Sequence, residues 1–409
     1  EKNQTNKELV TEVQNDGMVG SRKGVNAPGV SINLPGITEK DASDIRFGLD
    51  HEINFIAASF VRKPQDVLDI RELLEEKHME HVQIFPKIES QEGIDNIDDI
   101  MKVSDGLMIA RGDMGVEIPF ENVPFVQKNL IKKCNAIGKP VITATQMLDS
   151  MQENPRPTRA EASDVANAVF DGTDATMLSG ESANGEYPVE SVATMNRIDI
   201  KAENALKDFG RDNLDFDNGD VTESIGASVA RVANELGVKT IVAATETGYT
   251  AKMISKYRPN ADILAVTFDD RTRRGLMVNW GVYPIVTEKP SNTDEMFDLA
   301  AAKAVETGLA KEGDLILIVA GSFHVVCDSL GYLRNHFAEE LGLKDPNQWN
   351  YVWIINWPMF EYDEGFGKWI AAHHPFTMLN PEDLHYLEDG EDPHQAHAQS
   401  YDIVLNGQE

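Results

Sequence analysis

The 409-residue sequence predicts an α/β protein built from repeated β/α units. Three observations support this prediction. Five short apolar runs recur between residues 53 and 178, and a polar cluster and an amphipathic helical stretch follow each run. The runs are apolar throughout, which is typical of parallel strands buried on both faces. Residues of reactive types follow every run, and such residues at many strand ends indicate a (β/α)8 barrel, whereas a doubly wound sheet gathers them at one switch point.

The five predicted strands cover residues 53–58, 82–85, 106–110, 140–144 and 175–178. A closed barrel needs eight strands, so we expect a partial one. The strands are followed by Ser59 and Arg62, by Lys87 and Glu89, by Arg111, Gly112 and Asp113, by Thr145 and Gln146, and by Ser179 and Glu181.

Different patterns flank this block on both sides. Residues 9–13 alternate like an antiparallel strand and precede an Asn-Asp-Gly turn, which resembles the end of another small β domain. The sequence opens at Glu1 without a Met, so we expect its start to lie inside a domain. A linker rich in Asp, Asn and Gly, about 208–220, leads to a second α/β block with strands at 240–244, 263–267, 283–286 and 315–319.

Composition limits the classes of partner. A formal charge of −31 argues against broad binding to nucleic acids or anionic membranes. No run approaches the 18–20 apolar residues of a membrane span. Cys134 and Cys327 are far apart in apolar surroundings, which predicts reduced thiols and a cytoplasmic protein. The last 88 residues differ from the rest, because they hold seven of the ten His and four of the five Trp.

Lys87, Glu89 and Asp113 form the strongest candidate site. Lys87 and Glu89 are two residues apart, so on a strand they point to the same side. A surface salt bridge explains that pair equally well. Asp113 follows the next strand in an Ala-Arg-Gly-Asp-Met-Gly segment, and two carboxylates suit Mg²⁺, which keeps sites free for substrate oxygens. A lysine, a metal and glycine-flanked amides would stabilise a phosphorylated or enolate-like substrate.

Other hydroxyl-rich segments carry weaker signals. Thr145 could serve the site or merely cap a helix. The loop 155–158 is interpreted as structural, because Thr158 and Glu161 have the spacing of a capping box. The loop 245–250 (Thr-Glu-Thr-Gly-Tyr-Thr) could hold a phosphate at a helix N-terminus, although ordinary βα loops look similar.

Residues 8–321 resemble the pyruvate kinase family. The resemblance lies in four segments in the family's order: VQIFPKIESQEG at 82–93, GLMIARGDMGVE at 106–117, VITATQMLDSMQENPRP at 141–157, and residues 164–185. It implies a partial barrel (strands 4–8, 29–215), a lid-domain remnant (1–28) and a C-terminal α/β domain (219–321).

The resemblance also implies roles for particular residues. Glu89 and Asp113 would be the metal carboxylates, and Lys87 would stabilise the enolate and the transferring phosphoryl group. Backbone groups of Ala110, Arg111 and Gly112 would contact the substrate carboxylate. Thr145 would act in the protonation relay, with Ser179 and Glu181 supporting the site. Thr245, Thr247, Gly248 and Thr250 would form a sugar-phosphate effector loop.

The implied reaction transfers a phosphoryl group from phosphoenolpyruvate to ADP, giving pyruvate and ATP, with Mg²⁺ or Mn²⁺ and K⁺ as cofactors in a homotetramer. By this resemblance three barrel strands, the K⁺ site, a nucleotide-contacting arginine and most of the lid would precede residue 1. A second effector loop would follow Gly321, where it is missing. We therefore expect impaired activity.

Residues 322–409 resemble bacterial aspartyl-tRNA synthetases, a class II α+β family. The matching segments are residues 328–343, WIINWPMFEY at 353–362, AAHHPFTM at 371–378 and AHAQSYDIVLNGQE at 396–409. Asp402 and Glu409 would align with the ATP and metal site, and His373 and His374 with active-site residues, although the histidines could be core residues. Gln408 replaces the usual Tyr. The segment lacks the anticodon-binding domain, so no tRNA binding is expected.

Both families fit residues 313–321, so we expect a crossover there, by recombination or by misassembled reads. Three functional interpretations compete: a pyruvate kinase, an inactive chimeric fragment, and another Mg²⁺-dependent enolate barrel of the aldol or citrate-lyase type.

Overall fold

The computed structural model describes residues 3–4, 9–10, 12–18, 20–21, 35–209, 221–290, 293–319, 351–363, 368–372, 377–384, 386 and 396–405. The chain divides into two units, residues 1–330 and 331–409. The predicted linker at 208–220 lies almost wholly outside the described residues, and the predicted crossover region 313–321 is described only as far as residue 319. Gln408, Glu409 and Cys327 also lie outside them, as do His373 and His374.

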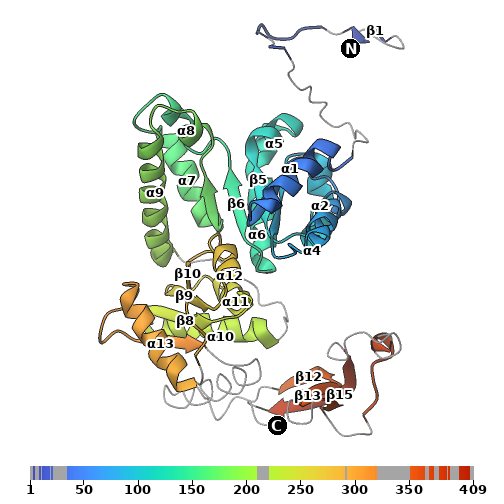
Figure 1. Ribbon diagram of the computed structural model, residues 1–409. Coiled ribbons are helices and arrows are strands. Elements are labelled where there is room, and N and C mark those ends of the chain that lie inside the picture. Colours follow the sequence, from blue (N-terminus) through green and yellow to red (C-terminus); the bar gives the residue numbers. More distant parts are fainter. Residues whose placement is uncertain are drawn as a thin grey trace. The chain divides into compact units, whose positions relative to one another are not determined.

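A five-stranded parallel sheet forms the first part of unit 1 (Figure 1). Its strands are β3 (Phe55–Ala58), β4 (Gln83–Ile88), β5 (Leu107–Ala110), β6 (Val141–Ala144) and β7 (Ala175–Met177). They stand side by side in chain order, without the reversal of a doubly wound sheet. All five predicted strands are confirmed. β4 continues past its predicted end because the fully buried Ile88 adds another core residue after Lys87.

Helices connect these strands and cover the sheet (Figure 1). They are α1 (Glu39–Asp50), α2 (Pro64–Glu76), α3 (Gln91–Asp95), α4 (Ile97–Val103), α5 (Arg111–Glu117), α6 (Val123–Ala136), α7 (Arg159–Asp171), α8 (Gly180–Ala183) and α9 (Pro188–Phe209), with 3₁₀ turns at Phe120–Asn122 and Asp149–Gln152. The predicted capping box before α7 is confirmed, since Thr158 and Glu161 exchange side-chain and backbone hydrogen bonds.

The core of this part contains fully buried aliphatic side chains, including Ile84, Ile109 and Val141. Gly106, just before β5, allows a close approach of β4. A Cβ atom at residue 106 would lie 2.3 Å from the Phe85 ring, so a larger residue there would displace this fully packed side chain.

The second part of unit 1 is a four-stranded parallel sheet in the order β10-β9-β8-β11. Its elements are α10 (Val221–Leu236), β8 (Thr240–Ala244), α11 (Tyr249–Lys256), β9 (Asp262–Thr267), α12 (Asp270–Gly275), β10 (Val282–Val286), α13 (Thr293–Glu306) and β11 (Ile316–Val319). The four predicted strands are confirmed. The strand order reverses between β8 and β11, which is the topological switch point where open α/β sheets bind ligands.

A buried ion pair joins the two parts of unit 1. The Asp174 carboxylate, just before β7, accepts hydrogen bonds from the Arg258 guanidinium at 2.8 and 3.0 Å. It also accepts from the backbone N–H groups of Trp280 and Val141, at 3.1 and 3.0 Å. The Arg258 guanidinium lies 5.0 Å from the centre of the Trp280 ring, a cation–π distance.

The remaining described elements are short. β1 (Asn3–Gln4) and β2 (Leu9–Val10) pair antiparallel near the predicted strand at 9–13. Unit 2 contains two antiparallel pairs, β12 (Tyr351–Pro358) with β15 (His397–Leu405) and β13 (Phe360–Asp363) with β14 (Lys368–Ala371), and a 3₁₀ turn at Pro381–Asp383.

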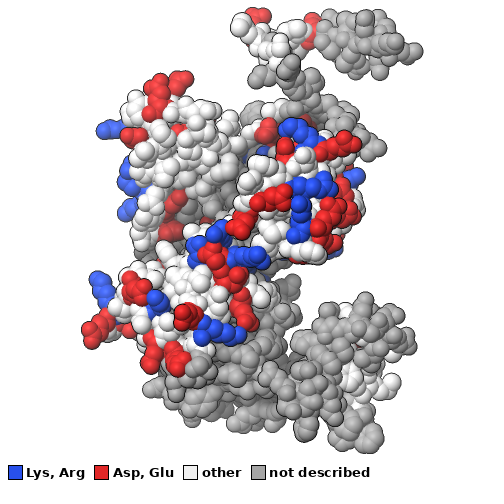
Figure 2. Space-filling model, in the orientation of Figure 1, with Lys and Arg blue, Asp and Glu red and all other residues white. Residues whose placement is uncertain are grey.

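Acidic and basic side chains alternate over helices α1 and α2 on the face shown in Figure 2. Surface pairs such as Arg46 with Glu76 and Lys77 with Asp50 account for part of this pattern. Within the described residues, no helix is both long and apolar enough to span a bilayer.

Candidate functional site

Lys87 and Glu89 lie together at the carboxyl end of β4. The Lys87 ammonium is 2.7 Å from Glu89 Oε1, and it also donates a hydrogen bond of 3.1 Å to Ser59 Oγ, at the end of β3. The Glu89 side chain is fully buried, whereas 23% of the Lys87 side chain is exposed. The pair is therefore a salt bridge with a buried carboxylate and a partly exposed ammonium.

The Glu89 carboxylate has an unusual environment. Its Oε2 accepts a 2.6 Å hydrogen bond from the Phe60 N–H, whereas Oε1 is buried without a hydrogen bond of good geometry. Burial raises the pKa of Glu89. Hydrogen bonds from Lys87 and from the Phe60 amide oppose this rise, whereas the negative charge of Asp113 adds to it. The Asp113 carboxylate is thus close enough to Glu89 for the two charges to repel.

These two carboxylates fit a divalent cation. A cation between them would relieve their repulsion and would share the buried Glu89 Oε1 with the Lys87 ammonium. Within the described residues, no group of three or more His, Cys, Asp or Glu could hold a metal. A site with two protein carboxylates suits Mg²⁺, which completes its octahedron with water and substrate oxygens.

Thr145, at the end of β6, has a left-handed backbone with φ of 67°, and Gln146 follows with φ of 54°. Such conformations cost about 1–3 kcal/mol each and are found where the surrounding structure enforces them. Thr145 Oγ1 accepts a 2.8 Å hydrogen bond from the Gly112 N–H and lies 2.6 Å from the Ala144 carbonyl oxygen, to which it donates. Thr145 does not cap a helix that follows β6; its hydroxyl accepts from the first turn of α5 and so joins the end of β6 to that helix.

The Arg111 guanidinium fixes this strained turn. It donates to the Thr145 carbonyl at 2.7 Å and to the Ala144 and Gln146 carbonyls at 3.3 and 3.4 Å. Asp164 on α7 holds its other side at 2.7 Å. The side chain of Arg111 therefore positions backbone, which leaves only its backbone N–H for a ligand. The role of Asp164 could not be predicted, because nothing in a single sequence marks a helix residue 53 positions away as the partner of Arg111.

Ser179 and Glu181 lie beyond β7. The Glu181 carboxylate is buried and accepts from the backbone N–H groups of Leu148 and Ser179, at 3.0 and 2.7 Å. Glu181 thus ties the loop after β7 to the loop after β6. Ser179 Oγ is buried without a hydrogen bond within the described residues.

The loop after β8 closes on itself. The buried Thr245 hydroxyl accepts a 2.9 Å hydrogen bond from the Gly248 N–H, and Thr247 Oγ1 accepts a longer one from the Tyr249 N–H. Thr247 is exposed, and Thr250 lies in the first turn of α11. This loop borders the switch point between β8 and β11. In unit 2, Asp402 lies on β15 opposite Ile354 of β12, and its backbone alone is described.

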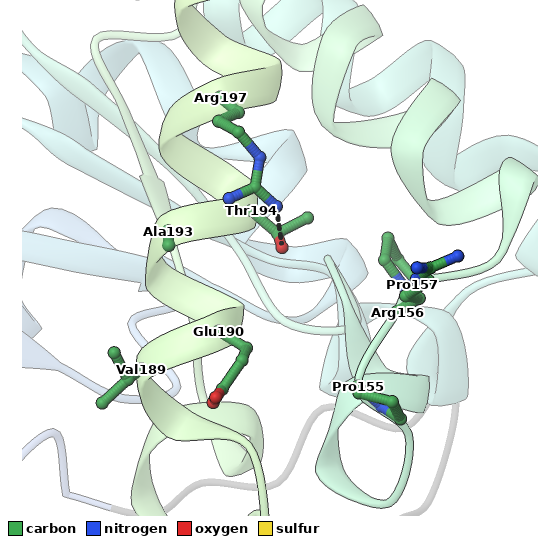
Figure 3. Close-up of a pocket in the computed structure, with 8 residues that line it drawn as sticks. All are labelled: Pro155, Arg156, Pro157, Val189, Glu190, Ala193, Thr194 and Arg197. Carbon is green, nitrogen blue, oxygen red and sulfur yellow. Dashed lines mark hydrogen bonds between the residues drawn. The ribbon is translucent and has the colours of Figure 1, made fainter.

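A separate pocket of about 490 Å³ lies beside the first turns of α9 (Figure 3). Pro155, Arg156 and Pro157 form one wall, and α9 forms the other, where Arg197 donates to Thr194 Oγ1 at 2.8 Å. None of the predicted site residues lines it.

Comparison with known proteins identifies both parts of unit 1. The family model "Pyruvate kinase, barrel domain" matches residues 1–192, and "Pyruvate kinase, alpha/beta domain" matches residues 223–328. The second match runs past the boundary expected at residue 321.

Curated relatives agree with these matches. A pyruvate kinase of Lactobacillus delbrueckii subsp. bulgaricus is 68% identical over 324 residues, 78% of this chain and 55% of the relative. A pyruvate kinase of Bacillus licheniformis is 60% identical over 322 residues, with the same shares. One from Staphylococcus aureus (strain MRSA252) is 59% identical over 318 residues, 77% of this chain and 54% of the relative. The chain spans about half the length of these relatives.

Proposed function

The chain belongs to the pyruvate kinase family through its barrel and α/β domains, and from that premise we propose that its site serves phosphoryl transfer from phosphoenolpyruvate to ADP, giving pyruvate and ATP. The observation that carries the proposal is the meeting of Ser59, Lys87, Glu89, Gly112 and Thr145 at the carboxyl ends of neighbouring parallel strands.

Glu89 and Asp113 would hold the Mg²⁺ or Mn²⁺ ion. When bound, this ion neutralises charge on substrate oxygens. Lys87 is held between Glu89 and Ser59, so its ammonium is fixed in place before substrate arrives. A fixed cation supports charge stabilisation of the enolate and the transferring phosphoryl group, because it needs no reorganisation during the reaction.

Thr145 would act in protonating the enolate carbon. The Gly112 N–H donates to the Thr145 hydroxyl oxygen, and the Arg111 guanidinium fixes the Thr145 backbone, so the hydroxyl has a defined direction. The backbone N–H groups at residues 111 and 112 would meet the substrate carboxylate. Binding that carboxylate would compete with Thr145 for the Gly112 N–H.

A sugar-phosphate effector would bind the loop 245–250, whose place at the switch point between β8 and β11 supports this role. K⁺, a homotetramer and a cytoplasmic location are further parts of the proposal that follow from the family.

The test is ADP-dependent pyruvate formation by the full chain, measured with lactate dehydrogenase and with Mg²⁺ present or withheld. Lys87→Met should lower the rate by about 10²–10³, the size expected for losing one preorganised charge. Lys102→Met is the matched control, since the Lys102 side chain is 75% exposed. Equal rates for wild type and Lys87→Met, in protein with unchanged circular dichroism, would reject the proposal.

An inactive chimeric fragment is the second candidate. β3 and β7 each have one strand neighbour among the described residues, so each presents an unpaired backbone edge. If the chain is an inactive fragment, it should show no turnover, and it should associate with rising concentration in sedimentation velocity. A monodisperse monomer would count against it. A third candidate, an aldol or citrate-lyase type enolate barrel, would require cleavage of a carbon–carbon bond and no ATP formation from phosphoenolpyruvate.

The resemblance of residues 322–409 to aspartyl-tRNA synthetases is also a proposal, and it rests on the sequence segments alone. A long sequencing read across codons 321 and 322 tests the crossover. Continuous genomic DNA would support a natural fusion, and a break would show two separate genes.

A further inference from the structure

Phe60, the second residue after β3, has a backbone conformation that its side chain does not favour. Its φ of 52° lies in the left-handed region, where a bulky residue other than glycine is an outlier. Glycine and asparagine adopt such a φ far more readily. The Phe60 residue is 47% exposed, so burial of its ring is only a weak constraint on this backbone. Backbone conformations of this kind are concentrated at functional sites, where the surrounding structure enforces them.

The loop just after this residue is fixed by contacts with α2 and α3. The Arg62 carbonyl oxygen accepts a 2.8 Å hydrogen bond from Nδ2 of Asn96, the residue that ends α3. The Arg62 N–H donates at 2.8 Å to the buried Asp66 carboxylate in the first turn of α2. Gly93 allows α3 to approach the Val61 carbonyl oxygen, which a Cβ atom at residue 93 would meet at 2.7 Å. The loop therefore has little freedom to move.

This fixed loop decides where the Phe60 N–H points. Because the peptide unit is planar, φ sets the orientation of the N–H relative to the chain that follows it. At a φ of 52°, the Phe60 N–H donates a 2.6 Å hydrogen bond to Glu89 Oε2. A negative φ, which Phe favours, would turn the N–H away from this oxygen unless the loop moved.

The hydrogen bond from Phe60 distinguishes the two oxygens of the Glu89 carboxylate. The Glu89 side chain is fully buried, so its oxygens depend on protein groups for partners. Oε2 is held by the Phe60 N–H, whereas Oε1 lies 2.7 Å from the Lys87 ammonium. Outer contacts of this kind orient metal ligands in proteins and are needed for full metal affinity.

We propose that Phe60 is a positioning residue for the metal site. Its left-handed backbone holds Glu89 Oε2, so that Oε1 stays directed at Lys87 and at the cation. The inference rests on the proposed role of Glu89 as a metal carboxylate. It assigns the role to the Phe60 backbone and not to the ring. A residue that tolerates the left-handed region should therefore replace Phe60, whereas a β-branched residue should not.

The test is Mn²⁺ binding by the full chain without substrate, measured from the electron paramagnetic resonance signal of free Mn²⁺. Phe60→Val should weaken binding by about 10–100-fold, the usual loss when a group that orients a metal ligand is disturbed. Phe60→Asn should bind Mn²⁺ about as tightly as wild type. His78→Val is the matched control, because His78 has a φ of 54° in an exposed turn after α2. It meets the same backbone strain and should leave Mn²⁺ binding unchanged.

The outcomes separate this inference from the proposed function. Equal weakening by Phe60→Val and Phe60→Asn would assign the effect to the ring and overturn the inference, as would unchanged binding in both variants. If Phe60→Val does not fold, Asn96→Ala removes the hydrogen bond to the Arg62 carbonyl and should weaken Mn²⁺ binding with unchanged circular dichroism. No weakening in that variant would also reject the inference. If wild type binds Mn²⁺ no better than Glu89→Gln, the proposed metal site itself fails and the inference falls with it.

Discussion

Replacing Asp174 by Asn should destabilise unit 1 more than any surface change, because this carboxylate neutralises a buried cation. The Asp174 and Arg258 side chains are 4% and 7% exposed. The carboxylate accepts four hydrogen bonds, two from Arg258 and two from backbone N–H groups.

The Asn side chain keeps one acceptor and introduces one NH₂ group. In either amide orientation that NH₂ group faces one Arg258 N–H and one backbone N–H, of Trp280 or of Val141. Two hydrogen bonds are lost, and the buried guanidinium loses the negative charge of Asp174. Removing one partner of such a pair costs about 3–5 kcal/mol in the free energy of unfolding. Asp270→Asn, which breaks pairs with the partly exposed Arg273 and Arg274, should cost about 0.5 kcal/mol or less.

Urea denaturation followed by circular dichroism at 222 nm measures this loss. With a slope of about 3 kcal/mol/M, a loss of 4 kcal/mol moves the midpoint by more than about 1 M. Hydrogen exchange should accelerate at the one amide, of Val141 or of Trp280, that faces the new NH₂ group, because the two amides use different oxygens of Asp174. A loss below about 1 kcal/mol, or unchanged exchange at both amides, would refute the assignment of this pair as a buried link.

Two further predictions concern the barrel part. Burial raises the pKa of Asp199 to about 6, against a hydrogen bond from Thr176, so the folded state binds its proton more tightly than the unfolded state. The free energy of unfolding should therefore fall as pH rises from about 4 to about 6. Asp199→Asn should remove this fall and raise the free energy of unfolding by about 1–2 kcal/mol at pH 7. Urea midpoints measured from pH 4 to pH 7 would show both effects. Asp164→Asn should weaken the hold of the Arg111 guanidinium on the Thr145 backbone, so it should lower kcat about tenfold with little change in KM. Asp99→Asn, on an exposed side chain, is the control and should change neither constant. A change confined to KM would contradict the positioning role of Asp164.

The sequence predicted strands well because a parallel strand buried on both faces leaves a plain apolar run, and the reactive residues follow it directly. Lys87, Glu89 and Thr145 could be found in this way. Arg258 and Asp164 could not, because each acts through one long-range contact, and a single sequence does not record which charges meet. The left-handed backbone at Thr145 was also unpredictable, since neither Thr nor Gln favours it and packing imposes it.

The two sheets of unit 1 differ in how freely their loops can change during evolution. In the sheet ordered β3 to β7, the loops after neighbouring strands meet at one edge and are tied together by contacts such as Gly112 with Thr145 and Leu148 with Glu181. In the sheet ordered β10-β9-β8-β11, the loops after β9 and β10 lie on one side of the switch point. Lengthened loops should therefore accumulate after β10, the strand farthest from that point, and should be rare at the carboxyl edge of the first sheet.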